Sequence, residues 1–482
     1  MALVQDFRRF NFGYADSITE LQQAPKLLQD GYYDLGGIED RVLNSHEFLI
    51  LGYKGSGKSA VGARLRLLAL NSPSQYSAPS PILVDKIPLR QFKGVMPDSM
   101  DNTRHRNAWI LNFLVRIIGA LAEDGQADPG SRKQIISVAK DLEKAGVTPR
   151  NPATMKWFRA NRVTTTVGMQ GAASISAEFE RQTDASTASD WIAYLETATR
   201  NFKSQRRHYF FVDGLDDLSL VQEGRSALLG GLIHAAADLN SLYSEGKTPI
   251  KIVVCCRTDL FSKLTLSPRG KIRRDYGLEL NWYQNPRDYR TSHLVRLANM
   301  RARLVDEGCN NIFEQYFPPK IDQKRSAEFL LLQTRHTPRD LLQLLKIIQR
   351  HTEEPGVIPE DNAKAGSRDY SQTYLIDEMR DALHAYFTEE QVSSVISFLG
   401  SIHRKNFTFQ EIQERFGSDS RFRRIDLDDA LSALFDTNFI GNVGTSGHFF
   451  FKYRNPEASL SYNERMQIHP GLWKAFNVTA RL

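Results

Sequence analysis

One glycine-rich segment, Gly52–Ser59, constrains the fold of this chain more strongly than any other part of its sequence. It reads Gly-Tyr-Lys-Gly-Ser-Gly-Lys-Ser and fits the pattern G-x-x-x-x-G-K-[ST] at every specified position. A short apolar run, residues 47–52, precedes it, and residues 58–70 are rich in helix formers. A phosphate-binding loop requires this strand–loop–helix context, which disfavours the alternative of a flexible Gly-Ser-Lys turn. We call Gly52–Ser59 the glycine loop.

The residue types of the glycine loop match the chemistry of a triphosphate bound with Mg²⁺. Its glycines let the backbone curl, so that successive N–H groups point inward at phosphate oxygens. Lys58 supplies a cation for the β- and γ-phosphates, and the Ser59 hydroxyl is a candidate Mg²⁺ ligand. The predicted nucleotide-binding residues of the loop are Gly52, Lys54, Gly55, Ser56, Gly57, Lys58 and Ser59.

An acidic segment after another apolar run supplies further candidate catalytic and metal-binding groups. Residues 208–213 read His-Tyr-Phe-Phe-Val-Asp, which predicts a buried strand with Asp213 at its carboxyl end. Asp213 is therefore predicted to bind Mg²⁺ through water or together with Ser59. Asp216 and Asp217 follow one turn later and are candidates to orient the attacking water, although both are equally suited to capping a helix.

Two single arginines follow predicted strand and helix boundaries. Arg257 ends the apolar strand 252–256, so a parallel sheet would place it at the ligand-binding edge, where it would grip a γ-phosphate or pair with Asp259. Thr337 and Pro338 form a cap and first helical position, which places Arg339 on the first turn of a helix. There Arg339 would link domain motion to the nucleotide, or it would be a surface arginine on an ordinary capped helix.

A basic segment before the predicted strand 277–282 contains candidate arginine fingers, which would reach the nucleotide of a neighbouring subunit. The alternative is a solvated basic turn. The candidates are Arg269, Arg273 and Arg274.

Strand and helix signals, among them a candidate second strand at residues 82–89, alternate up to about residue 286. This alternation predicts an α/β fold with a parallel sheet covered on both faces. The predicted fold class is a parallel-sheet P-loop NTPase core with a helical lid domain and a C-terminal winged-helix domain. The helical stretch 101–205 is predicted to be an insertion that offers a partner or oligomer surface, with a hairpin or loop at 164–179. The predicted divisions are a lead-in at 1–45, the ATPase α/β domain at 46–286, the helical lid at 287–367 with a linker at 353–367, and the winged-helix-like domain at 368–482.

The composition of the chain restricts its possible partners, its use of cysteine and its cellular location. The 482 residues carry 62 Lys and Arg against 56 Asp and Glu, a net charge of +6, which permits a polyanionic partner such as nucleic acid. Only three cysteines occur, and Cys255 and Cys256 are adjacent in a predicted strand, so neither a disulfide framework nor a metal cage is expected. No membrane-spanning run or secretory leader is apparent, and we expect a cytoplasmic protein without a membrane partner.

Together these motifs resemble the AAA+ class of oligomerising P-loop ATPases, and more closely its signal-transducing (STAND) branch with the NACHT ATPases. Residues 213–217, Asp-Gly-Leu-Asp-Asp, are similar to the NACHT signature, Arg257 to that branch's arginine sensor, and residues 337–339 to its second sensor. The segments 12–16, 51–59 and 468–475 resemble orphan bacterial P-loop ATPases that tend to lie beside phage-defence or DNA-processing genes. The sequence departs from typical AAA+ motors at Gly214, where those motors carry glutamate, which implies slow hydrolysis.

The resemblance implies an ATPase that uses ATP and Mg²⁺ as a molecular switch, assembling with itself and with a separate effector protein in bacterial antiviral defence. No guanine-reading Asn-Lys-x-Asp motif is apparent, so ATP is favoured over GTP. The alternative is an ATP-dependent DNA-binding protein of initiator or loader type, and a third reading is a scaffold that binds ATP without hydrolysing it. The DNA-binding alternative depends on a basic cluster in the C-terminal region: Arg404, Lys405, Arg421, Arg423 and Arg424.

Overall fold

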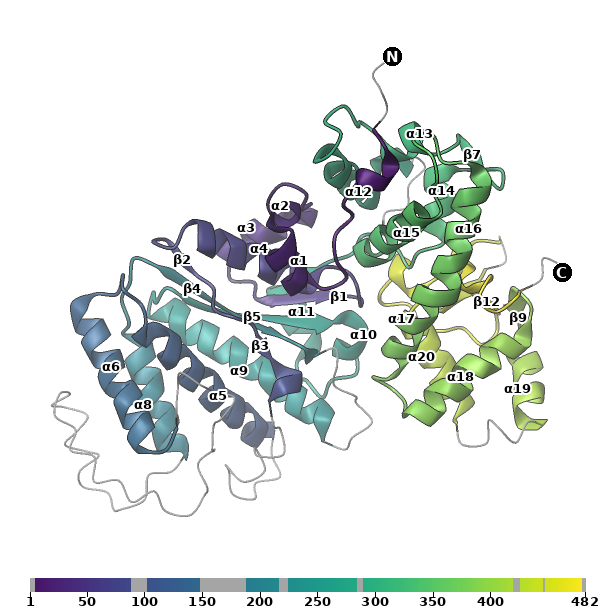
Figure 1. The fold of residues 1–482 in the computed structure, drawn as a ribbon. Helices are drawn as coiled ribbons and strands as arrows, with labels where there is room; N and C mark the ends of the chain where they lie inside the picture. Colours follow the sequence, from purple (N-terminus) through teal and green to yellow (C-terminus); the bar gives the residue numbers. More distant parts are fainter. Residues whose placement is uncertain are drawn as a thin grey trace.

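A parallel β-sheet forms the centre of the N-terminal half of the chain (Figure 1). The computed structural model describes residues 5–87, 102–147, 188–215, 224–283, 289–418, 425–444 and 447–478. The strand order is β2-β4-β5-β1-β6, with β3 also pairing with β4, and every pairing within this sheet is parallel. The strands are β1 (Leu49–Gly52), β2 (Tyr76–Ser77), β3 (Ile82–Leu83), β4 (Arg207–Asp213), β5 (Ile250–Arg257) and β6 (Gly277–Glu279).

Helices cover both faces of this sheet, which explains why β4 and β5 are almost continuously apolar. Alternate residues of β5 enter different hydrophobic cores: Cys255 packs with the core that includes Val61 of α4, and Cys256 with the core that includes Trp109 of α5. The two adjacent cysteines therefore point to opposite faces of the sheet, as neighbouring strand residues do, and all three cysteines of the chain are buried. The helices of this half are α1 (Ser17–Gln23), α2 (Pro25–Gln29), α3 (Ile38–Asn44), α4 (Lys58–Asn71), α5 (Asn102–Ala122), α6 (Pro129–Lys144), α8 (Ala188–Arg200), α9 (Arg225–Glu245), α10 (Thr258–Phe261) and α11 (Arg269–Tyr276).

The C-terminal half is mainly helical and ends in a small antiparallel sheet of order β11-β10-β12-β9. A helical group comes first, and three helices that alternate with short strands follow it (Figure 1). The helices are α12 (His293–Arg303), α13 (Ile312–Tyr316), α14 (Ser326–Leu332), α15 (Pro338–Arg350), α16 (Glu360–Tyr370), α17 (Ile376–Leu383), α18 (Glu389–Ile402), α19 (Phe409–Ser418) and α20 (Leu427–Asp436). The strands are β7 (Lys320–Ile321), β8 (Lys324–Arg325), β9 (Asn406–Phe407), β10 (Ile440–Val443), β11 (Phe449–Phe450) and β12 (Arg465–Ile468).

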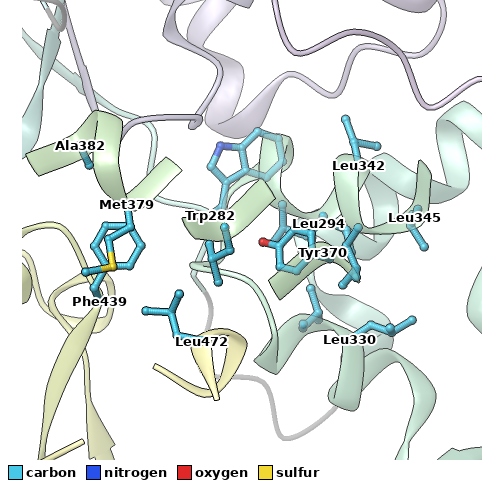
Figure 2. Close-up of a cluster of buried hydrophobic side chains, with 14 of the residues drawn as sticks. Trp282, Leu294, Leu330, Leu342, Leu345, Tyr370, Met379, Ala382, Phe439 and Leu472 are labelled. Atoms are coloured by element: carbon cyan, nitrogen blue, oxygen red, sulfur yellow. The ribbon is translucent and has the colours of Figure 1, made fainter. Parts of the chain in front are cut away.

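One continuous hydrophobic core joins the two halves beside the glycine loop (Figure 2). Trp282 comes from the segment after β6, Leu294 from α12, and Phe439 and Leu472 from the C-terminal end. The Trp282 indole N–H donates to the Ser56 carbonyl oxygen at 2.8 Å, so this core also holds the back of the loop.

Three predictions of secondary structure need correction. The predicted linker 353–367 is wrong in its second part, because α16 begins at Glu360 and continues through a π-helical turn into α17. Gly366 permits this helix to approach α15 closely, since a Cβ there would lie 2.7 Å from a side-chain atom of Ile348. The predicted strand from 82 ends at Leu83 and becomes a 3₁₀ turn, and the strand predicted over 277–282 ends at Glu279.

Other predictions concern the fold class, the 101–205 stretch and membrane helices. The fold class is α/β with a parallel sheet, as predicted, and the described part of the 101–205 stretch is helical. The hairpin predicted at 164–179 lies outside the described residues. None of the described helices combines the length and apolar character needed to cross a membrane.

Candidate nucleotide-binding site

The glycine loop connects the end of β1 to the start of α4, as its sequence predicts. Gly55 and Gly57 have φ angles of 83° and 97°, a left-handed conformation that strains any residue with a Cβ. Gly52 is required for a different reason, because a Cβ at this position would collide with Ser56 Oγ. The loop is therefore tightly curled around its own centre.

Polar groups inside the loop fit an anion. The Lys58 side chain is buried, and its Nζ donates to the carbonyl oxygens of Gly52 at 3.2 Å and Tyr53 at 3.3 Å. Ser56 Oγ is also buried and has no hydrogen-bond partner among the described residues. A buried cation and an orphaned hydroxyl in a loop of curled backbone are a donor set that suits a phosphate group.

A cavity with a volume of about 420 Å³ lies against this loop. Lys58, Ser59 and Asp213 all line it, so the predicted phosphate-binding and metal-binding groups share one space. Asp213 ends β4, and its Oδ1 accepts a hydrogen bond from the Gly214 N–H at 2.8 Å. The Ser59 hydroxyl and the Asp213 carboxylate are oxygen ligands of the kind that Mg²⁺ prefers.

Asp85 is a carboxylate of this cavity that sequence reasoning missed. It follows β3, which pairs with β4 in the parallel register Leu83↔Asp213, and it lines the same cavity. The sequence predicts a strand over residues 82–89, which would place Asp85 in its middle. In the structure β3 ends at Leu83, so Asp85 lies at the carboxyl edge of the sheet, where ligands bind.

The N-terminal segment, expected to be only a lead-in, forms another wall of the cavity. Tyr14 and Glu20 line it together with Arg301 of α12. Arg301 Nη2 and Glu20 Oε1 form a buried ion pair at 2.6 Å, and Arg301 Nη1 donates to the Phe12 carbonyl oxygen at 2.6 Å. Gly13 is required beside this pair, because a Cβ there would collide with both Arg301 and Glu20. Residues 12–16 carried only a resemblance to orphan bacterial P-loop ATPases, so the place of this segment in the cavity wall was not predicted.

Arg339 occupies the first turn of α15, as the Thr337 cap and Pro338 predict, and it faces the glycine loop. The Thr337 hydroxyl accepts from the Asp340 N–H at 3.3 Å, and the Arg339 N–H donates to the Gly55 carbonyl oxygen at 3.3 Å. Its side chain lines the cavity and is 30% exposed, so it remains accessible to a ligand.

Arg257 is not among the residues that line this cavity. Its Nε and Nη2 bind Asp259 at 3.1 and 2.5 Å, and the pair is buried rather than at the surface. Asp259 also accepts from the Tyr386 hydroxyl at 2.6 Å. Burial alone would raise the pKa of Asp259, but Arg257 and the Tyr386 hydroxyl outweigh it, so that pKa lies below its ordinary value. In this conformation Arg257 is therefore held by a carboxylate, which was the alternative to a phosphate grip.

The remaining predicted site residues lie apart from the cavity or outside the described residues. Arg269 donates to the Ser262 carbonyl oxygen, Arg273 pairs with Glu279 and with Glu457, and Arg274 is exposed. These candidate fingers do not line the cavity of their own subunit. Asp216 and Asp217 lie outside the described residues.

Carboxylates of α17 neutralise cations around the glycine loop. Glu378 lies 3.1 Å from Arg335, 3.7 Å from Arg339 and 3.9 Å from Lys54, measured between charged nitrogen and oxygen atoms. Asp381 pairs with Lys54 at 2.9 Å. The C-terminal half thus binds the same cations that a phosphate chain would attract.

Comparisons with known proteins identify one part of the chain. Residues 292–378, from the start of α12 into α17, match the family described as FunZ-associated C-terminal helical domain. The comparison with curated proteins gives no match. Among solved structures, Cdc6p from Pyrobaculum aerophilum matches at 13% identity and a TM-score of 0.32, covering 99% of each chain.

Two structures of RuvB from Thermotoga maritima, one of a single-site variant and one described as a Holliday junction branch migration motor, match at 14% identity and a TM-score of 0.24. Each match covers 53% of this chain and 71% of the RuvB chain. The interpretation of the site therefore depends on the geometry of this chain alone.

Proposed function

We propose that this protein is a Mg²⁺-dependent ATPase of the AAA+ class that works as a nucleotide-controlled switch. The observation that carries the proposal is that four residues from three elements line one cavity on a curled glycine loop: Lys58 and Ser59 of α4, Asp213 of β4 and Arg339 of α15. Of the functions considered, nucleoside triphosphate binding uses all four groups.

Each residue of the cavity has a separate task in this proposal. The backbone N–H groups of the loop and Lys58 hold the phosphate chain, and Ser59 and Asp213 hold the metal. Mg²⁺ would neutralise charge that develops on the phosphate oxygens. Arg339, from the helical half, contacts the terminal phosphate and so links that half to the bound nucleotide. The Tyr14 ring is 41% exposed and is suited to contact the base.

We place domain boundaries at residues 46–286 for the nucleotide domain, 287–367 for the helical lid and 368–482 for a winged-helix module. Three helices, α18 to α20, followed by the antiparallel pair β10 and β11, support the winged-helix assignment. The match at 292–378 extends beyond the boundary at 367, in agreement with the continuity of α16 and α17.

The switch rests on competition between phosphate and protein carboxylates. Lys54 and Arg339 both line the cavity; Lys54 pairs with Glu378 and Asp381, and Arg339 with Glu378. A bound γ-phosphate would attract the same cations and weaken the contact between the loop and α17. A ligand shifts a conformational equilibrium only through such differential contacts.

We further propose that the ATP-bound form assembles with itself and with a separate effector, in bacterial antiviral defence. The resemblance to defence-associated P-loop ATPases supports the setting. The exposed side chains of Arg269 and Arg274 support a role in contacting a neighbouring subunit.

The test compares wild type with Lys58→Ala in two measurements: calorimetric binding of ATP analogue and ADP in Mg²⁺ buffer, and oligomeric mass with each nucleotide. We expect wild type to bind and to change mass with the ATP analogue, and Lys58→Ala to do neither. Lys320→Ala, an exposed lysine of β7, is the control and should behave as wild type. Absence of nucleotide binding by folded wild type would refute the ATPase; binding without any change of mass would refute the assembly switch.

The DNA-binding alternative keeps one supporting observation. Arg404 is 58% exposed on the C-terminal module, near Lys405, whereas Arg421, Arg423 and Arg424 lie outside the described residues. Titration of duplex DNA at two salt concentrations separates the candidates, because phosphate contacts weaken steeply with salt. No binding at low salt would remove this alternative.

A further inference from the structure

We propose that Asp85 is the general base of ATP hydrolysis in this protein, the group that takes a proton from the attacking water. This inference rests on the proposed ATPase function and goes further by assigning a residue that no sequence motif identified. It starts from the position of Asp85 at the edge of the sheet.

The 3₁₀ turn that follows β3 places Asp85 in the wall of the cavity. Ile82 and Val84 are buried in the core beneath α5, whereas Leu83 and Asp85 line the cavity. Because β3 pairs in register with the last residues of β4, Asp85 extends just beyond Asp213 at the same sheet edge. Its side chain is 19% exposed, so it remains open to solvent within the cavity wall.

The space next to Asp213 is arranged for this carboxylate. Gly214 follows Asp213 with φ of 80° and carries no side chain. A Cβ on residue 214 would lie 2.6 Å from Asp85 Oδ1, so the Asp85 carboxylate fills the place where a side chain of residue 214 would begin. The Asp85 carboxylate thus lies against the residue that follows Asp213, and both carboxylates line the same cavity.

The two carboxylates have different surroundings, which suits different tasks. Asp213 Oδ1 accepts the Gly214 N–H, which fixes its orientation as a metal ligand requires. Asp85 pairs at 2.8 Å with Lys86, whose side chain is 75% exposed, and an ion pair so open to solvent is easily released. Asp85 is therefore the more adaptable of the two and is better placed to accept a proton.

The reaction balances without further reactants. The water oxygen forms a bond to the γ-phosphorus as the bond from that phosphorus to the β,γ-bridging oxygen breaks, and ADP leaves with the electron pair. One water proton passes to the Asp85 carboxylate and then to solvent, leaving inorganic phosphate. General-base assistance of this kind contributes about 10²- to 10⁴-fold to a rate.

The test is Asp85→Asn, which keeps shape and removes the base, beside Asp30→Asn, an exposed aspartate at the end of α2. We expect Asp85→Asn to lower the rate of phosphate release by about 100-fold or more, with the affinity for ATP and the Mg²⁺ requirement unchanged within about threefold. Nucleotide recovered from the variant after incubation with ATP should be ATP, whereas wild type should yield ADP.

Each other outcome has a defined meaning. If Asp85→Asn hydrolyses ATP at the wild-type rate, or loses ATP affinity as Lys58→Ala does, Asp85 is not the base. Loss of hydrolysis in Asp216→Asn or Asp217→Asn with Asp85→Asn unaffected would assign the base to that residue instead. Wild type that binds ATP but never hydrolyses it would overturn the role of Asp85 and leave a binding switch, whereas wild type that binds no nucleotide would overturn the proposed function itself.

Discussion

The carboxylate of Glu378 is predicted to weaken ATP binding, because it holds cations that the phosphate chain needs. Replacing it in Glu378→Gln removes the negative charge 3.7 Å from Arg339 and 3.9 Å from Lys54. The neutral amide keeps an oxygen acceptor for Arg335, which also retains two hydrogen bonds of 2.8 Å from its side chain to Asp340. We therefore expect the variant to fold.

The size of the effect follows from these distances. Two unit charges at 4 Å interact by about 4 kcal/mol at an effective dielectric constant of about 20. The Lys54 and Arg339 side chains are 16% and 30% exposed, and Lys54 keeps Asp381 as a partner, so solvent and the second carboxylate reduce this value. We expect about 1–2 kcal/mol to be recovered in ATP binding, or roughly 5- to 30-fold tighter affinity.

Isothermal titration calorimetry with a non-hydrolysable ATP analogue measures this change directly. ADP, which carries one phosphate fewer, should gain less. Glu389→Gln is the matched control, because the Glu389 side chain is 65% exposed and pairs with Arg380 and His384 away from the cavity. A folded Glu378→Gln protein whose ATP affinity equals or falls below that of wild type would show that the α17 carboxylates do not compete with phosphate.

Three further predictions concern stability. Arg301→Met leaves the Glu20 carboxylate buried without its cation and should lower the free energy of unfolding by about 3–5 kcal/mol. In thermal unfolding, the double variant Arg301→Met/Glu20→Gln should recover part of this loss. Equal stability of the single and the double variant would contradict the coupling. Gly214→Ala should cost about 1–2 kcal/mol, since its φ is 80° and the new Cβ would strike Asp85, and melting with no loss would refute the close approach. Burial lowers the pKa of His336 to about 3 in the folded protein. As the pH falls below about 6.5, the unfolded chain therefore takes up a proton on this histidine before the folded chain does. The free energy of unfolding should then fall by about 1.4 kcal/mol per pH unit from this histidine. In His336→Asn, urea unfolding at about pH 7.5 and 5.5 should differ less than in wild type, and an equal difference would exclude this histidine as a cause.

Features encoded within a few neighbouring residues were predictable. The glycine loop combines a local backbone shape with a buried strand and a helix start, and all three are properties of contiguous sequence. Thr337 and Pro338 determine where α15 begins, so the place of Arg339 on its first turn followed as well. Helix caps and glycine turns depend on hydrogen bonds within a few residues, which makes them readable without the fold.

Contacts between distant segments were decided by the tertiary structure. Glu20 pairs with Arg301, 281 positions away, and Asp259 accepts from Tyr386, 127 positions away. No pattern of neighbouring residues in the sequence predicts either contact. Asp85 became a candidate base only when β3 was paired with β4 and Gly214 left room for its carboxylate.

The amino-acid order alone therefore determined a curled glycine loop between a strand and a helix, with its lysine, and a carboxylate at the end of another strand. Which cations lie open to a ligand, which are held by carboxylates, and which second carboxylate joins Asp213 depended on the folded chain. The physical reason is range: backbone conformation is set by adjacent residues, whereas the ionic environment of a cavity is set by whichever side chains packing brings together.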